Sequence, residues 1–563
     1  MPRTHALSPT VSVAPQIHPE DMADLAAAGF RAVICNRPDG EGPDQPVFEE
    51  IRQAAQAAGI EAAFLPVASG KVTDDQAGAF AGLIDRLPRP VLAYCRSGTR
   101  SATLWSLAEA ARGRPLPEII AAAKAAGYDM TGVARRIANG GRTPVDGTSL
   151  HHDVVIVGGG AAGIAAASSL KARKPDLDIA IIDPADIHYY QPGWTMVGGG
   201  VFDARTTART MASLIPPGVT WIKAAVAAFE PNARAVILDG CRVITWRALV
   251  VAPGLKLDWT AIPGLAETLG RNGVTSNYRY DLAPYTWELV QGMKSGRAIF
   301  TQPPMPIKCA GAPQKAMYLS ADHWRRQGVL SGIDINFCTA GAVLFGVKDY
   351  VPALMSYVER YGIHLRFQER LTRIDGPART AWFTRTDAAG QTSTVERGFD
   401  MIHVVPPQCA PDFVKVSPLA DADGWVDVDP SSLRHRQYDG VYGLGDVCNA
   451  PNAKTAAAAR KQAPVVAHNL LRDLGLISGV DAVYDGYGSC PLTVERGRIV
   501  LAEFGYGGKL LPSFPNWLID GRRPSHLAWL LKERMLPWMY WKAMLRGREW
   551  LAKPKPALPA SAQ

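Results

Sequence analysis

A glycine-rich turn between two apolar strands constrains this chain more than any other feature. Residues 153–183 read DVVIVGGGAAGIAAASSLKARKPDLDIAIID. The β-branched run at 154–157 predicts a strand, and the small residues after the turn predict a helix. Gly158 permits a tight turn, Gly160 lets the backbone approach a pyrophosphate, and Gly163 lets the helix pack close to the strand. This pattern predicts a dinucleotide-binding βαβ unit.

The acid that ends the second strand completes the pattern. Asp183 follows Gly163 by about 20 residues, the spacing of a carboxylate that accepts hydrogen bonds from an adenosine ribose. The free N–H groups and the dipole at the start of the helix favour a bound phosphate. Strand, turn, helix, second strand and acid therefore occur in register, which disfavours a glycine turn of some other α/β protein.

The length and charge of the chain narrow its class. At 563 residues it exceeds the size of one hydrophobic core, which predicts two or three domains. A net charge of +8 suits anionic lipid, anionic substrates or nucleic acid, but no basic run with interleaved aromatic residues indicates a nucleic-acid groove. We find no apolar segment of signal-peptide or membrane-span length, so we expect a cytoplasmic protein.

The first part of the chain alternates helical and strand patterns. Residues 1–140 predict a small α/β domain with a mostly parallel sheet, and the Gly- and Pro-rich stretch 141–152 predicts a linker. The last strand runs into the loop CRSGTRS at 95–101. A cysteine between a strand and a helix N-terminus lies among inward-pointing N–H groups, which lower its pKa. Cys95 is therefore a candidate nucleophile, and Arg100 a candidate to hold an anion or steady the thiolate.

The CRSGTRS loop resembles the active loop of rhodanese sulfurtransferases. Four residues separate Cys95 from Arg100, whereas tyrosine phosphatases have five. With HPEDMADLAAAGFRAVICNRPDGE upstream, the domain is similar to a family of small phosphatase-like domains described as sulfurtransferases. The resemblance implies sulfur transfer through a persulfide on Cys95 ahead of phosphatase activity, with an inert packed thiol as the remaining alternative. Cys35, inside an apolar strand, is expected to be a core residue.

The order of motifs after Asp183 resembles that of flavoproteins with two dinucleotide domains. In those proteins an aspartate of the closing motif, here Asp446 of VYGLGDVCN, contacts the ribityl chain of the flavin. The helix after it would point its N-terminus at the pyrimidine edge of the flavin, so FAD is the expected cofactor. The loop after 297–300 reads TQPPMPIKCAGAPQKAMYLSADHW. Prolines and a lysine replace the glycines of a second fingerprint there, which disfavours a nicotinamide donor.

From Asp153 to the C-terminus the chain resembles the sulfide:quinone oxidoreductases, in the subgroup that includes the mitochondrial enzyme. The motifs are PPMPIKCAGAPQKAMYLS, GDVCNAPNAKTAAAA, YDGYGSCPL, RIVLAEFGY and PWMYWKAMLRG. The resemblance implies that Cys309 and Cys490 form a redox pair beside the flavin. It carries the cofactor contacts of the family over to Ala161, Ala162, Asp183, Gln191, Val226, Asp446, Lys454 and Thr455.

The remaining cysteines and a nearby lysine leave alternatives open. The eight cysteines contain no CxxC, which disfavours a zinc site or a disulfide framework, and we expect no metal site. Cys448 lies in the flavin motif and competes with the pair as the redox thiol; only the resemblance excludes it. Lys308 is either a residue that lowers the pKa of the neighbouring thiol or a solvated lysine. Three other cysteines are expected to pack as small hydrophobes: Cys241, Cys338 and Cys409.

The C-terminal segment HLAWLLKERMLPWMYWKAMLRGREWLAK mixes large apolar residues with cations, and Pro537 is expected to break it into two helices. Such helices either lie in a membrane interface or cover the flavin domain. The resemblance favours peripheral membrane attachment, with hydrogen sulfide as substrate, ubiquinone or another membrane quinone as electron acceptor, and a small thiol or sulfite as sulfur acceptor. An NAD(P)H-dependent quinone or disulfide reductase, and an N-terminal phosphatase or regulatory module, remain alternatives. The sequence indicates no oligomeric state.

The expected fold class is α/β. A phosphatase-like or rhodanese-like α/β domain precedes a tandem Rossmann flavoprotein with C-terminal amphipathic helices. The expected boundaries are 1–140 for the first domain, 141–152 for the linker, 153–265 and 401–500 for the two parts of the FAD-binding domain, 266–400 for the central domain, and 501–563 for the membrane-interface region.

Overall fold

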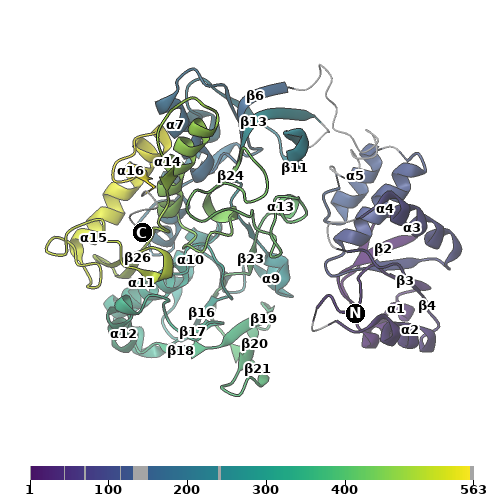
Figure 1. The fold of residues 1–563 in the computed structure, drawn as a ribbon. Coiled ribbons are helices and arrows are strands. Elements are labelled where there is room, and N and C mark those ends of the chain that lie inside the picture. The colour runs from purple at the N-terminus through teal and green to yellow at the C-terminus, as the bar shows by residue number, and fades with distance from the viewer. Residues whose placement is uncertain are drawn as a thin grey trace. The chain divides into compact units, whose positions relative to one another are not determined.

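A computed structural model of the chain describes residues 2–42, 45–68, 72–114, 116–130, 133, 150–238 and 242–557 (Figure 1). The chain divides into two compact units. The first comprises Met1–His151, Ala224–Thr245 and Asp412–Pro418, and the second comprises the remainder. Residues 141–149 of the predicted linker, and Cys241, lie outside the described residues. Residues 150–152 of that linker begin strand β6 (Leu150–Val157).

A five-stranded sheet forms the centre of the first unit, in the order β1-β2-β5-β3-β4. Its strands are β1 (His5–Ala6), β2 (Val11–Ala14), β3 (Ala32–Cys35), β4 (Glu61–Phe64) and β5 (Val91–Tyr94). Only β1 pairs antiparallel; β2, β5, β3 and β4 run parallel. The helices are α1 (Met22–Ala27), α2 (Phe48–Ala57), α3 (Asp74–Arg86), α4 (Thr99–Ala111) and α5 (Leu116–Ala125).

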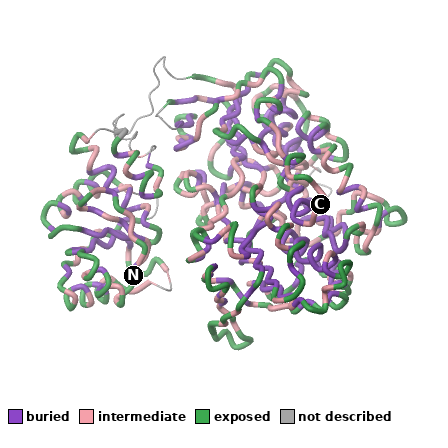
Figure 2. Tube along the Cα trace, turned by 180° about the vertical axis from the view of Figure 1, so that it is seen from behind, coloured by how far each residue is buried: buried purple, intermediate pink, exposed green. Residues whose placement is uncertain are grey.

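Helices cover both faces of this sheet, because alternate strand residues point to opposite sides. Val33 and Leu92 pack with residues of α1 and α2 on one face. Ile34 and Ala93 pack with residues of α3, α4 and α5, including Trp105, on the other. Every residue of the inner strands β3 and β5 is therefore buried, whereas the edge strand β4 is partly exposed. Figure 2 colours the chain by burial.

In the second unit, the glycine fingerprint lies between β6 and α7 (Ala161–Arg173). The surrounding sheet runs β10-β7-β6-β13, and β24 pairs with β13. Its strands are β7 (Ile179–Ile182), β10 (Val219–Ile222), β13 (Val243–Val251) and β24 (Val441–Gly443). Helix α14 (Ala456–Asp473) packs against α7. In the first unit, β11 (Val226–Glu230), β12 (Ala235–Leu238) and the start of β13 form an antiparallel meander.

A second parallel sheet, in the order β15-β22-β16-β17-β18, follows in the central part of the chain. Its strands are β15 (Val274–Thr275), β16 (Gly296–Gln302), β17 (Ile333–Thr339), β18 (His364–Phe367) and β22 (Met401–His403). The covering helices are α10 (Leu282–Gly292), α11 (Ala312–Arg326) and α12 (Val351–Arg360). An antiparallel sheet extends it: β19 (Glu369–Asp375), β20 (Thr380–Thr386) and β21 (Thr392–Gly398).

Short elements complete the second unit, apart from α13, which belongs to the first. The strands are β8 (Ile187–Tyr189), β9 (Ala208–Thr210), β14 (Lys256–Leu257), β23 (Gln408–Cys409), β25 (Ala482–Val483) and β28 (Lys555–Pro556). The helices are α8 (Trp194–Val197), α9 (Leu265–Thr268) and α13 (Asp412–Lys415). A hairpin of β26 (Gly488–Glu495) and β27 (Arg498–Phe504) lies beside α11.

The C-terminal segment is one helical run rather than two helices separated at Pro537. Helix α15 (His526–Leu530) continues through a π-helical stretch, Leu531–Met535, into α16 (Leu536–Lys542). Proline lacks an N–H donor and its ring crowds the carbonyl one turn earlier. The predicted break at Pro537 is therefore wrong: the irregularity is a π turn just before the proline, where a wider turn can accommodate the ring. Among the described residues, no helix has the length and apolarity needed to cross a membrane.

Candidate functional site

Cys309 and Cys490 meet in the structure although 181 residues separate them along the chain; their Sγ atoms lie 3.7 Å apart. Both are free cysteines. Cys309 lies in the turn between β16 and α11 with a positive φ of 49°, and its backbone N–H donates to the carbonyl of Lys454 at 2.9 Å. Cys490 is buried in β26. The structure therefore places together the two thiols that the resemblance paired.

Two buried lysines influence the pKa values of the two thiols. Lys315, on the first turn of α11, donates from Nζ to the Sγ of Cys309 at 3.1 Å. The hydrogen bond from Cys490, together with this ammonium group, holds the pKa of the Cys309 thiol well below its usual value. The same hydrogen bond and burial raise the pKa of Cys490. These contacts favour negative charge on Cys309 over negative charge on Cys490 in the reduced pair.

The second lysine, Lys532, comes from the π-helical stretch and is buried. Burial, followed by repulsion from Lys315, lowers its pKa to about 7, while the two thiols act in the opposite direction. Lys532 therefore changes charge near neutral pH beside the sulfur pair.

Lys308, the lysine next to Cys309 in sequence, does not contact the thiol. Its ammonium donates to the side chain of Gln191 and lies over the rings of Trp194 and Tyr278. Its side chain is half-buried, and burial lowers its pKa. Sequence reasoning missed Lys315 and Lys532. The sequence pattern could have indicated Lys315, because it lies on the same helix face as the apolar residues Ala312 and Leu319. A lysine on a buried face is costly unless its charge is paired.

One thiol of the pair, that of Cys309, lines a cavity of about 590 Å³ in the second unit, whereas Cys490 is buried behind it in β26. Cys309, Lys315 and Lys532 line it. So do most of the predicted cofactor contacts: Gly160, Ala161, Ala162, Asp183, Gln191, Asp446, Lys454 and Thr455. Val226 is not among the lining residues; it is buried in β11, in the first unit.

The glycines at the start of α7 are required by close backbone approach. A Cβ on Gly163 would lie 1.8 Å from the carbonyl oxygen of Gly158, and one on Gly158, at φ 105°, would lie 2.4 Å from the carbonyl oxygen of Ala252. Gly160 has open space where its Cβ would be. The carboxylate of Asp183 accepts from the N–H of Gly159 at 2.6 Å, which ties the second strand to the turn.

Polar residues around the start of α14 form the opposite end of the cavity. Thr455 caps the helix by accepting from the N–H of Ala458 at 3.1 Å. Lys454 donates to the carbonyls of Asp446 and Cys448 at 2.8 and 2.7 Å, and so fixes the loop that precedes the helix. Burial raises the pKa of Asp446 and lowers that of Lys454. The open N–H groups of α14 thus face the cavity.

The other cysteines are separate from this pair. Cys448 is buried, and burial raises its pKa to about 12, as it does for Cys338. Cys338 packs in an apolar cluster with Ile299 and Phe383, as expected. Cys409 is half-buried in β23 rather than packed in the core.

Cys95 lies buried at the end of β5, and Arg100 belongs to the first turn of α4. The guanidinium of Arg100 makes a bidentate pair with Glu41, at 2.8 and 2.6 Å, and also donates to the carbonyl of Val67 at 2.7 Å. Gly98 has a φ of 84°, and a Cβ there would collide with the hydroxyl of Tyr128. Arg100 therefore ties the start of α4 to Glu41 and to the backbone at Val67.

Cys35 is buried at the end of β3 with the apolar residues of one face of the sheet, as expected for a core residue. Its thiol donates to the carbonyl of Arg37 at 3.3 Å, and burial raises its pKa.

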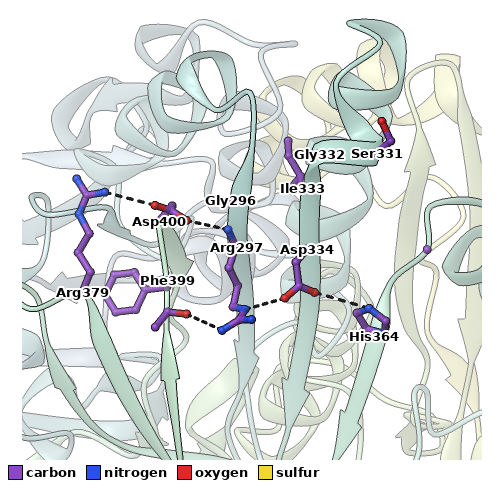
Figure 3. A pocket seen from close by; sticks show the side chains of 12 residues that line it. Gly296, Arg297, Ser331, Gly332, Ile333, Asp334, His364, Arg379, Phe399 and Asp400 are labelled. Atoms are coloured by element: carbon purple, nitrogen blue, oxygen red, sulfur yellow. Dashed lines mark hydrogen bonds and ion pairs between the residues drawn. The ribbon is translucent and has the colours of Figure 1, made fainter.

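Figure 3 shows a second hollow, of about 870 Å³, at the amino ends of β16, β17 and β18. Its charged side chains pair with one another: Arg297 with Asp334 at 2.7 Å, and Arg379 with Asp400 at 3.6 Å. Dinucleotides bind outside the carboxyl ends of parallel strands, so this hollow lies at the wrong edge for a nicotinamide. At the carboxyl end of β16 stands the loop that carries Cys309.

Two protein-family models match the chain. "Beta-lactamase hydrolase-like protein, phosphatase-like domain" matches residues 4–112, and "Pyridine nucleotide-disulphide oxidoreductase" matches residues 152–286. The N-terminal domain is 38% identical over 116 residues to the beta-lactamase hydrolase-like protein of Agrobacterium fabrum, covering 20% of this chain and 27% of that protein.

The second unit has relatives over most of their length. The mitochondrial sulfide:quinone oxidoreductase of Dictyostelium discoideum is 42% identical over 404 residues, covering 71% of this chain and 87% of that protein. That of Mus musculus is 38% identical over 397 residues, covering 70% and 87%. The crystal structure of the sulfide:quinone oxidoreductase of Aquifex aeolicus superposes with a TM-score of 0.59 at 19% identity, over 71% of this chain and 92% of that one. The predicted α/β fold class is confirmed.

Proposed function

Because this chain belongs to the sulfide:quinone oxidoreductase family, we propose that it oxidises hydrogen sulfide to sulfane sulfur and passes the electrons to a membrane quinone. The observation that supports this most strongly is the Cys309–Cys490 pair, in which Cys309 contacts Lys315 and lines a cofactor-sized cavity. A sulfur nucleophile needs a disulfide to attack and a stabilised thiolate to expel. The pair supplies both.

The family implies a flavin, and we propose FAD. The cavity extends from the fingerprint turn and Asp183 to the start of α14, as an adenine dinucleotide with a flavin requires. Three of its lining residues bear buried polar atoms without a hydrogen-bond partner in the described part of the chain: Trp194, Thr195 and Asn277. Such atoms fit a polar ligand. When bound, FAD would accept two electrons and hand them to the quinone.

The difference in pKa between the two thiols indicates which cysteine is attacked and which one leaves. With the pair oxidised, hydrosulfide attacks the Sγ of Cys490, a persulfide forms there, and the S–S bond breaks so that Cys309 leaves as the thiolate. Lys315 stabilises that thiolate, and the better leaving group is the thiol of lower pKa. Cys309 lines the cavity in which we propose that the cofactor binds. A small thiol or sulfite then takes the sulfane sulfur from Cys490.

Apolar residues on the C-terminal segments support attachment to a membrane surface. Trp517 is 83% exposed, and a further set of apolar side chains on 518–551 is at least 41% exposed: Leu518, Leu527, Met535, Trp538, Trp550 and Leu551. Large aromatic residues beside cations are typical of a helix in the membrane interface. We propose that this surface binds the membrane peripherally and admits the quinone.

For the N-terminal domain we propose sulfur transfer through Cys95. The cysteine ends a strand just before a helix N-terminus, and Glu41 holds Arg100 in place beneath the loop. A persulfide is anionic, so the N–H groups of the loop and α4 suit it. Phosphatase or regulatory activity is the second candidate, favoured by the match to a phosphatase-like domain.

The first test is anaerobic. Sulfide should bleach the flavin absorbance of the purified protein, NADH should not, and a soluble quinone should restore it. Cys309→Ser and Cys490→Ser should each abolish bleaching, whereas Cys409→Ser, a half-buried cysteine in β23, should leave it intact. Bleaching by NADH alone, or normal bleaching in both serine variants, would refute the assignment.

A second test concerns Cys95. After turnover with sulfide and quinone, mass spectrometry should find an additional sulfur on Cys95, and Cys95→Ser should lower the yield of persulfide product. Cys35→Ser is the control for a buried cysteine of the same sheet. Hydrolysis of a generic aryl phosphate that is lost in Cys95→Ser, without sulfur on Cys95, would favour the phosphatase candidate instead.

A further inference from the structure

The two faces of the β26–β27 hairpin carry different functional side chains. Cys490 packs on one face with Leu492 and Ala502. Alternate residues, among them the cross-strand pair Ser489 and Glu503, line the cavity on the other face. Successive strand residues point to opposite sides, so this separation follows from the strand geometry. One buried carboxylate thus faces the cavity away from the sulfur pair.

The carboxylate of Glu503 is held by three donors. Its Oε1 accepts from the hydroxyls of Tyr487 and Ser513, each at 2.6 Å, and its Oε2 accepts from the N–H of Ser513 at 3.0 Å. Glu503 is 5% exposed. Tyr487 and Ser513 also line the cavity. A buried carboxyl group that is hydrogen-bonded to two hydroxyl groups can exchange a proton along those hydrogen bonds.

Cations and a further tyrosine surround this network. Arg460 of α14 lines the cavity, and burial lowers its pKa. The ammonium of Lys461 lies 5.2 Å from the ring of Tyr487. Tyr350 contacts only the backbone of Glu503: it donates to the carbonyl and accepts from the N–H, both at 3.0 Å. Arg460 and Lys461 thus place positive charge near the Glu503 network.

The same end of the cavity suits an apolar carrier. Leu501, Phe514, Leu536 and Met539 line it. The segments that bear Phe514 and Leu536 continue directly into exposed apolar side chains, such as Trp517 and Trp538. An apolar molecule that enters from a lipid surface would therefore bring its polar head to Glu503. A quinone has such a head, and its reduction needs protons that neither lipid nor an apolar wall provides.

We propose that Glu503 is the proton donor to the quinone, an inference that rests on the proposed oxidoreductase function. The carboxyl O–H bond breaks and its proton goes to one oxygen of the quinone. A bound, reduced flavin would supply the two electrons and the other proton. The carboxylate that remains regains a proton from water through the hydroxyls of Tyr487 and Ser513. Negative charge that arrives on the cofactor favours this proton uptake by a neighbouring carboxylate.

The test separates the two half-reactions. In Glu503→Gln, sulfide should reduce the flavin at the normal rate, while reoxidation by a short-chain ubiquinone analogue should slow by roughly 10²-fold or more, the usual contribution of a general acid. The solvent deuterium isotope effect on reoxidation should change with it, and Glu503→Asp should restore part of the rate. Binding of the analogue, followed by tryptophan fluorescence, should stay within twofold.

Glu495→Gln is the matched control. Glu495 is a buried glutamate at the end of the same hairpin that accepts from the hydroxyl of Tyr357 at 3.0 Å, but it does not line the cavity in the described chain. It should behave as wild type. Normal reoxidation in Glu503→Gln, or equal slowing in both variants, would overturn the inference.

Dithionite separates this inference from the proposed function. If sulfide fails to reduce the wild-type flavin, the function fails, but dithionite-reduced protein still reports whether Glu503 serves quinone reduction. Should Glu503→Gln not retain flavin, Tyr487→Phe removes one hydroxyl of the network and keeps the ring. It should also slow reoxidation and alter its isotope effect, and an unchanged rate would again overturn the inference.

Discussion

Replacing Lys315 with methionine should raise the pKa of the Cys309 thiol. The substitution keeps an unbranched side chain in a buried position but removes the ammonium that donates to Sγ at 3.1 Å. A hydrogen bond to a charged group is worth about 1.5–3 kcal/mol. At about 1.4 kcal/mol for each pH unit, the midpoint of thiolate formation should rise by about one to two pH units.

The midpoint can be measured on the reduced protein. The rate of alkylation by iodoacetamide is followed from pH 5 to about 10, and peptide mass spectrometry assigns the product to Cys309, because only the thiolate reacts. Lys171→Met is the control. That lysine donates to the carbonyls of Pro175 and Leu177 on the surface of α7, where no thiol is involved. An unchanged midpoint in Lys315→Met, or the same change in both variants, would refute the electrostatic account of the pair.

Three other perturbations test different parts of the structure. Burial lowers the pKa of Lys532 to about 7, so between about pH 7 and 10 the folded protein binds fewer protons than the unfolded protein. The free energy of unfolding should therefore rise with pH in this range, by of order 1 kcal/mol per pH unit. Lys532→Met should remove this rise, which urea melts at several pH values would measure. Gly163→Val should yield protein without flavin absorbance, because the Cβ would meet the carbonyl of Gly158 at 1.8 Å, and retention of flavin would contradict the packing argument. Trp517→Ser combined with Trp538→Ser should reduce flotation with anionic liposomes several-fold while sulfide still bleaches the flavin.

Local chemistry made the fingerprint region predictable. The roles of Gly158 and Gly163 depend on close approach of backbone atoms within a few residues, and the structure shows that approach. The same holds for the inner strands β3 and β5 of the N-terminal sheet, which are continuous apolar runs because helices cover both faces. The residue pattern alone was therefore sufficient to predict these elements.

The sulfur site could not be derived in this way. Nothing in the spacing of Cys309 and Cys490, 181 residues apart, indicates that they meet, and only the family resemblance paired them. Sequence proximity pointed to Lys308, whereas the lysine in contact with the thiol is Lys315, because the start of α11 turns its side chain back toward Cys309. Lys532 reaches the pair from the far end of the chain. Such contacts are set by tertiary packing, which a linear pattern does not contain.

The π turn at Leu531–Met535 acts as a one-residue insertion in the C-terminal helix. Lys532 and Tyr540 both line the cavity although they are eight residues apart, which in a regular α-helix would place them about 80° apart around the axis. The additional residue in the wide turn brings them to within about 20° of the same direction. Trp538, between them, remains free to face outward. A single irregular turn thus allows one short helix to place both a lysine and a tyrosine at the cavity and an indole at the surface.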